Sequence, residues 1–391
     1  MQYKLLFLFV SLLISNLAYA QSEKVISGPN VRLPTDSIIS KQLINALNAF
    51  MNEKDKPNEE ISSILPEQKV ETFILIDEMK DIEKSGKYQD DLFYKPYLMN
   101  IVNISDNQYY LQLAFIGIDQ NLPILRANFE LIAHKTDDLF LFSSTLVYNT
   151  KHWKTINKEK DILHYEHIIN ESKVQEYITL KTLFDKKLQQ ENKITELYCC
   201  DNILQLLRLI GVTYKSDYNG QVHNVFTSIF NEKQLIMLGN ENEAFNNFDL
   251  HDLWHDRLSL VVSRKKVNRP IDEGYAYLYG GSWGVTWQDV LKEFRQKINY
   301  NRETDWLNFK ETQEGYVGNK GDKFVVDYII NAIILQKIEN EKGFAGVWEF
   351  LNCGPYEKGN ENYFTALETL TSINKSNYNN MVLNLLDAEF K

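Results

Sequence analysis

The spacing of apolar residues changes along this chain, and the change limits the folds that it can adopt. Between residues 96 and 147, four segments alternate apolar and polar side chains and are separated by turn-forming residues. Alternation with a period of two is typical of antiparallel strands with one buried face. After residue 244, apolar residues recur every three or four positions, as in amphipathic helices. The sequence therefore predicts an α+β protein with a strand-rich first part and a mostly helical second part.

The first part is expected to form a small α+β domain over residues 37–190, preceded by a polar lead-in at 21–36. It faintly resembles a cystatin or nuclear-transport-factor type unit. The predicted elements are a helix at 37–51, strands at about 96–104, 109–117, 124–134 and 138–147, a further strand at 163–169 and a helix at 173–190.

The second domain is expected to cover residues 191–391. It starts with strands at 194–200, 224–230 and 234–238 and a helix at 201–210, which Gly211 ends. Helices are then predicted at 244–265, 271–279, 286–298, 322–341, 344–352, 360–371 and 376–389.

The first twenty residues have the features of a cleavable signal peptide. Lys4 supplies the positive charge, and residues 5–14 form an apolar run that is too short to span a bilayer. Ala18-Tyr19-Ala20 fits a cleavage site, so we expect a mature protein that begins at Gln21 and is exported to the periplasm or the exterior. The alternative is an N-terminal anchor helix. No second segment has spanning length, so no membrane span is predicted.

Charge and cysteine content exclude further classes. The formal net charge is −11 and no Lys/Arg block stands out, so a nucleic-acid partner is not expected. The three cysteines are odd in number and irregularly spaced, which argues against a disulfide framework. Cys199 and Cys200 would point to opposite faces of a strand and are expected to be buried thiols.

Two histidines, His251 and His255, lie four residues apart in the segment NNFDLHDLWHDR, residues 246–257. Positions four apart share one face of a helix, so both imidazoles can reach one zinc ion. The surrounding residues are largely apolar, and a metal would satisfy polar groups that are costly to bury alone. The alternative is that both are ordinary capping or core residues.

A third candidate ligand, Glu273, follows in the segment EGYA, and seventeen residues separate it from His255. Small residues beside Glu273 would let its helix lie close to the first one. The pattern HDLWH…EGYA resembles the gluzincin zinc metallopeptidases, whose H-E-x-x-H helix precedes a helix with E-G-x-A. The resemblance covers roughly residues 194–391. It implies a thermolysin-like, mostly helical domain that binds zinc through His251, His255 and Glu273 and acts on peptides.

The resemblance also identifies departures. Asp252 occupies the position of the family's general base, which is a glutamate, and its carboxylate reaches about 1.5 Å less far. A misplacement of about 1 Å can cost on the order of a hundredfold in rate. Tyr277 stands where thermolysin-like members have an Asp that orients the first histidine. Tyr328 is the candidate donor to the developing oxyanion, and the alternative is that it is a core aromatic.

Two functions fit these features. The first is an exported zinc-binding metallopeptidase homologue whose peptide hydrolysis is weakened by Asp252. The second is a non-catalytic protein on a degenerate peptidase scaffold that binds a peptide, protein or glycan, which the 22 Tyr, 21 Phe and 6 Trp would suit. Residues 280–284, GGSWG, are predicted to form a turn between helices near the cleft. The histidines His134, His152, His164, His167 and His223 are not expected to be ligands.

Overall fold

The computed structural model describes residues 24–137, 139–190, 193–218, 225–239, 243–298 and 300–390. The predicted signal peptide and its cleavage site before Gln21 lie outside this range. The chain divides into two compact units, which are described separately: one comprises residues up to Ile168 together with Ile194–Ala244, and the other Ile169–Lys193 together with Phe245–Lys391. Helices and sheets are both present, which confirms the α+β class. No helix in the described part is long and apolar enough to cross a membrane.

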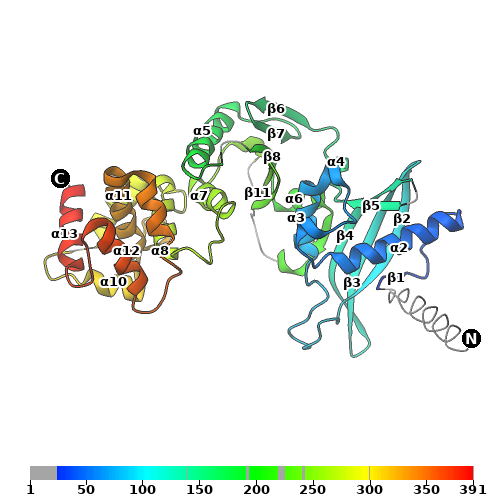
Figure 1. Ribbon diagram of the computed structural model, residues 1–391, viewed down its shortest axis with the longest axis horizontal. Helices are drawn as coiled ribbons and strands as arrows, with labels where there is room; N and C mark the ends of the chain where they lie inside the picture. Colours follow the sequence, from blue (N-terminus) through cyan, green and yellow to red (C-terminus); the bar gives the residue numbers. More distant parts are fainter. Residues whose placement is uncertain are drawn as a thin grey trace, which may run out of the picture. The chain divides into compact units, whose positions relative to one another are not determined.

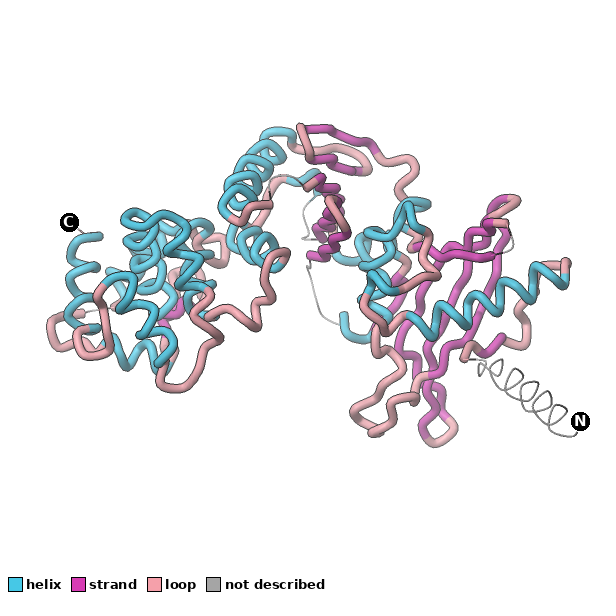
Figure 2. The backbone as a smooth tube through the Cα atoms, viewed as in Figure 1, coloured by secondary structure: helices cyan, strands magenta, loops and turns pink. Residues whose placement is uncertain are grey.

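A six-stranded sheet forms the larger layer of the first unit (Figures 1 and 2). The four predicted strands are present, but the last one is shorter than predicted because the chain turns into the short helix α4 (Leu146–Asn149). The predicted lead-in also contributes a strand, which pairs in parallel with its neighbour. The order is β1-β2-β3-β4-β5, with β9 also paired to β4, for β1 (Ile26–Ser27), β2 (Lys95–Ser105), β3 (Gln108–Asp119), β4 (Leu122–Thr136), β5 (Leu139–Ser143) and β9 (Val212–Lys215).

Two helices of the first unit differ in how readily the sequence reveals them. Helix α2 (Ser37–Glu53) was predicted and lies across the sheet, and the side chain of Asp36 caps its first turn (Figure 1). Helix α3 (Lys69–Met79) was not predicted. It buries eight of its eleven residues, so it lacks the apolar stripe that marks an amphipathic helix.

A second sheet completes the first unit, in the order β10-β11-β8-β7-β6. Strand β8 lies between β7 and β11 and runs parallel to both. Side chains of β8 and β11, including Tyr198 and Met237, belong to the same core cluster as the first sheet. The strands are β6 (Lys154–Lys158), β7 (Asp161–Tyr165), β8 (Ile194–Cys200), β10 (Val225–Phe230) and β11 (Lys233–Gly239), and helix α6 (Ile203–Ile210) follows β8.

The division into two units therefore differs from the prediction, which placed a single boundary at residue 190. Residues 194–244 return to the first unit because β8 pairs with β7 and β9 pairs with β4. Helix α5 (Glu171–Lys187) belongs instead to the second unit. There Arg257 donates through Nε to Asp185 Oδ1 over 2.6 Å, and both side chains are buried.

The second unit is mostly helical, as predicted (Figure 2). The helix predicted at 244–265 is shorter, since the Asp249 side chain caps it at residue 250. The helices predicted at 322–341 and 344–352 form one element, α11, which is interrupted at Gly343 with φ 68°. Helix α10 and the β12–β13 hairpin were not predicted. The elements are α7 (Leu250–Ser259), α8 (Arg269–Gly280), α9 (Trp287–Lys297), α10 (Trp306–Thr312), β12 (Gly315–Val317), β13 (Lys323–Val325), α11 (Val326–Leu351), α12 (Glu361–Thr371) and α13 (Tyr378–Glu389).

Helix α8 approaches both α7 and α11 closely through glycines. A Cβ on Gly280 would lie 2.3 Å from the backbone nitrogen of His251 at the start of α7. A Cβ on Gly274 would lie 2.7 Å from the Cβ of Asn331 on α11. The glycine beside Glu273 thus faces α11 and not the histidine helix, which corrects the predicted role of the small residues next to Glu273. It is Gly280 that makes the close approach to α7.

Candidate metal centre

The two histidines of α7 present their Nε2 atoms to one point. The carboxylate of Asp249 accepts the backbone N–H of His251 over 2.8 Å and so fixes the first turn of the helix. His251 and His255 are one turn apart, and their Nε2 atoms lie 3.1 Å from each other. This separation suits two imidazole nitrogens that bind one cation.

Glu273 on α8 completes the group. Its Oε2 lies 3.4 Å from His251 Nε2 and 3.6 Å from His255 Nε2. Two ligands that are each about 2.1 Å from a tetrahedral ion lie about 3.4 Å apart, so these separations fit one ion at the centre. The side chains are only 13%, 9% and 12% exposed for His251, His255 and Glu273. The three residues predicted as ligands thus come together, and the group could hold a metal ion.

The outer nitrogens of both histidines are held by fixed acceptors. His251 Nδ1 lies 2.8 Å from the carbonyl oxygen of Gly281 in the turn after α8, and a proton on Nδ1 leaves Nε2 free to bind. His255 Nδ1 lies 3.0 Å from Asp272 Oδ1, which also accepts the indole N–H of Trp254 over 3.0 Å. Such partners of metal-binding histidines fix the ring orientation and raise its basicity.

Asp272 was not predicted as a site residue, and Tyr277 was identified as a departure at the position where thermolysin-like members have an Asp that orients the first histidine. The ring of Tyr277 is buried and lies 5.6 Å from that of His251, so it packs against the site. The carboxylate of Asp272, directly before Glu273 in the first turn of α8, orients the second histidine, His255. The adjacent acids Asp272 and Glu273 could have indicated a role for Asp272. Two neighbouring carboxylates on a buried helix point in different directions, and each needs its own partner. The turn predicted at 280–284 lies between α8 and α9 but starts one residue later, because Gly280 is the last residue of α8, and Thr286 caps α9.

The charges around the centre favour a cation there. Burial acts to lower the pKa of His255, but hydrogen bonds with the carboxylates of Asp272 and Glu273 outweigh burial and raise it to about 9. Burial acts to raise the pKa of Glu273, yet the hydrogen bonds from His251 and His255 bring it well below its usual range. The two carboxylates therefore stabilise positive charge, whether an imidazolium or a metal ion carries it.

Asp252 and Tyr328, the two residues predicted to be catalytic, lie on the helices that frame the centre. Asp252 is half-buried in the first turn of α7, one residue after His251. Burial and then the charge of Asp252 raise the pKa of Asp256, one turn further along, to about 7. The Tyr328 ring on α11 lies 5.9 Å from that of Tyr277. Burial and then the charge of Glu273 raise the Tyr328 pKa, so its hydroxyl keeps its proton at neutral pH.

The remaining histidines serve local roles in the described part of the chain. His164 stacks on Tyr198 with ring centroids 4.2 Å apart, and its Nε2 lies 3.2 Å from Glu196 Oε2. His134 Nε2 lies 2.8 Å from Ser143 Oγ. His167 is 74% exposed beyond its strand, and His152 is exposed. His223 lies outside the described residues. Cys199, Cys200 and Cys353 are free thiols; Cys200 is buried, as predicted, whereas Cys199 is only partly buried.

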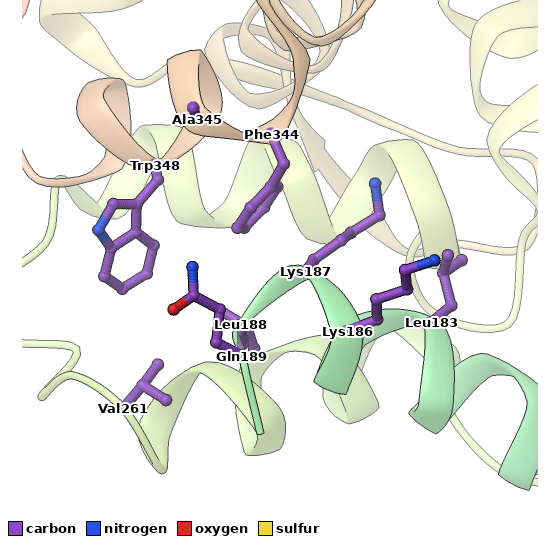
Figure 3. A pocket seen from close by; sticks show the side chains of 9 residues that line it. All are labelled: Leu183, Lys186, Lys187, Leu188, Gln189, Val261, Phe344, Ala345 and Trp348. Carbon is purple, nitrogen blue, oxygen red and sulfur yellow. The ribbon is translucent and has the colours of Figure 1, made fainter. Parts of the chain in front are cut away.

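A separate groove of about 700 Å³ opens in the second unit (Figure 3). Figure 3 shows Phe344 and Trp348 of α11 pointing toward Leu188 and Gln189 at the end of α5. Lys187 beside them is paired with Glu339, which also accepts hydrogen bonds from Tyr275 and Tyr279. Most residues that line the groove are apolar, and Lys186 adds a second positive charge. The lining residues are Leu183, Lys186, Lys187, Leu188, Gln189, Val261, Phe344, Ala345 and Trp348.

No protein-family model matches this chain, and searches of curated proteins and of solved structures also give no match.

Proposed function

We propose that this protein is an exported zinc-binding metallopeptidase homologue of the gluzincin type, with His251, His255 and Glu273 as the zinc ligands. The observation that carries the proposal is the mutual spacing of His251 Nε2, His255 Nε2 and Glu273 Oε2, at 3.1, 3.4 and 3.6 Å. Two imidazoles and one carboxylate are a ligand set that zinc accepts in hydrolytic sites. The order HDLWH…EGYA and the mostly helical second unit are consistent with it.

The chain's own residues would divide the chemistry of peptide hydrolysis among them. The bound ion would act as a Lewis acid that polarises a peptide carbonyl and activates water. Asp252 would accept a proton from the water that attacks the peptide carbon and deliver it to the amine nitrogen as the C–N bond breaks. The protonated hydroxyl of Tyr328 would donate toward the carbonyl oxygen as that oxygen becomes negative. His255 is held for binding by Asp272, and His251 by the Gly281 carbonyl.

Metal analysis of the purified chain tests the proposal directly. After dialysis against zinc and removal of the free ion, we expect about one zinc per chain, as three converging ligands imply. Element-specific mass spectrometry of the protein peak in size-exclusion chromatography measures this ratio. A chain that takes up no zinc under zinc-replete conditions would refute the metal centre.

Asp272→Asn should weaken zinc binding by about 10–100-fold, the usual effect of losing a carboxylate that supports a histidine ligand. The variant keeps the size of the side chain but removes the charge that stabilises His255. Competition with a chromophoric zinc chelator gives the dissociation constant. Asp289→Asn is the matched control, because Asp289 lies in the first turn of α9 as Asp272 does in α8. An equal effect of both variants would contradict a specific role for Asp272.

A second candidate function, non-catalytic binding of a peptide or protein, is favoured by the groove of Figure 3. Its volume of about 700 Å³ is within the range of ligand sites, and its walls are aromatic and aliphatic. The exposed Lys186 at its edge suits an amphipathic segment with an acidic residue. The two functions differ in one outcome, which is whether an Asp252→Glu variant, with the family's base restored, hydrolyses peptides.

A further inference from the structure

The loop between α7 and α8 brings a permanent cation into the metal centre. Arg264 Nη2 lies 3.1 Å from Glu273 Oε1 and 3.4 Å from His255 Nε2. Its Nε donates to Asp272 Oδ2 over 2.8 Å. A guanidinium has only donors and stays protonated, so it cannot be a metal ligand itself. Arg264 thus contacts one histidine ligand, His255, and the carboxylate ligand, Glu273, but is not a ligand itself. It also contacts Asp272, whose carboxylate orients His255.

Two of the residues that Arg264 contacts, His255 and Glu273, are also proposed ligands of the metal ion. Glu273 has its negative charge shared between Oε1, which faces Arg264, and Oε2, which faces the histidines. A divalent ion near Oε2 and a guanidinium at Oε1 would repel each other, and screening is weak in a site this poorly exposed. The Arg264 side chain is 41% exposed, so it can turn toward solvent.

The geometry points to Arg264 as an internal cation that competes with the metal ion for Glu273 and His255 and so lowers the metal affinity of the centre. This inference rests on the proposed zinc site and concerns its regulation. The site would then bind zinc only at elevated zinc concentration, and Arg264 would keep its contacts with the ligands when zinc is scarce.

A supporting role for Arg264 would have the opposite sign. If the guanidinium only held Asp272 and Glu273 in place, its loss would weaken zinc binding, by about 10–100-fold for a typical supporting contact. If it competes with the ion, its loss strengthens zinc binding. The direction of the change therefore decides between the two roles, and it does not depend on any peptidase activity.

The test is the zinc dissociation constant of Arg264→Gln, measured by chelator competition at one pH and one ionic strength. Gln keeps hydrogen-bond donors and removes the charge, so we expect zinc to bind at least about tenfold more tightly. Arg264→Lys keeps the charge but loses the fork of donors, so its zinc affinity should lie between those of the wild type and Arg264→Gln. Arg269→Gln is the matched control: Arg269 Nε lies 3.6 Å from Glu273 Oε1, but its side chain is 72% exposed, so a smaller gain is expected.

Two results would overturn the inference. Equal or weaker zinc binding by Arg264→Gln, with a wild type that binds one zinc, rejects competition and leaves the proposed zinc site intact. A wild type and an Arg264→Gln variant that both bind no zinc reject the site itself. Arg264→Met, which also removes the charge, replaces Arg264→Gln if circular dichroism shows that the Gln variant is not folded, and the same outcomes apply.

Discussion

His251→Ala should lower the zinc affinity of this protein by on the order of a thousandfold. Zinc sites in small proteins have apparent binding free energies of about 10–16 kcal/mol, so one of three ligands supplies on the order of 4 kcal/mol. Each 1.4 kcal/mol is about tenfold in the dissociation constant. The remaining pair, His255 and Glu273, cannot close a tetrahedral site on its own.

The measurement is zinc stoichiometry after dialysis, followed by chelator competition where zinc is retained. His167→Ala is the control, because the side chain of His167 is 74% exposed and its replacement removes an imidazole without disturbing packing. The His251 ring contacts Tyr277, so thermal unfolding is compared first. A folded His251→Ala variant with wild-type zinc content would place the ion elsewhere in the chain.

The ligands could be predicted from sequence because their placement depends on local geometry. Four residues make about one helical turn, so His251 and His255 share a face wherever the helix lies. Alternation likewise revealed four strands of the first sheet, β2 to β5, whereas the short strands β1 and β9 were not predicted. Helix α3 escaped notice because it is buried on most sides, and α10 because it has only seven residues. Periodicity needs both a polar face and sufficient length.

The parts that could not be predicted depend on long-range packing. Asp272, Gly281 and Arg264 reach the histidines only because α8 and the loop before it fold back on α7. The boundary between units was misplaced for the same reason. Strand β8 has an ordinary alternating pattern, and nothing in its own sequence shows that it pairs with β7. In the sequence, β7 and β8 are separated by α5, which belongs to the other unit.

Asp252→Glu should raise peptide hydrolysis by this protein, or create it, with little change in zinc affinity. A general base contributes about 10²–10⁴-fold, so a gain of that order is the upper limit. Asp252 lies in the first turn of α7 beside His251, and its carboxylate is about 1.5 Å shorter in reach than that of a glutamate. The added methylene would bring the carboxylate to where the base of the gluzincin family acts.

Overpacking works against this gain, since one added methylene in a tight site can cost about 1–3 kcal/mol. Folding and zinc content are therefore measured before activity on a broad peptide library. Asp252→Asn, which has the shape of the wild type and no charge, should abolish residual hydrolysis. Asp252→Glu combined with His251→Ala should be inert if the gain requires the metal.

A folded, zinc-loaded Asp252→Glu variant that is less active than the wild type would show that the cleft is built for aspartate. If both forms leave every peptide intact, the base is not the only missing element, and binding in the groove becomes the better account of the protein.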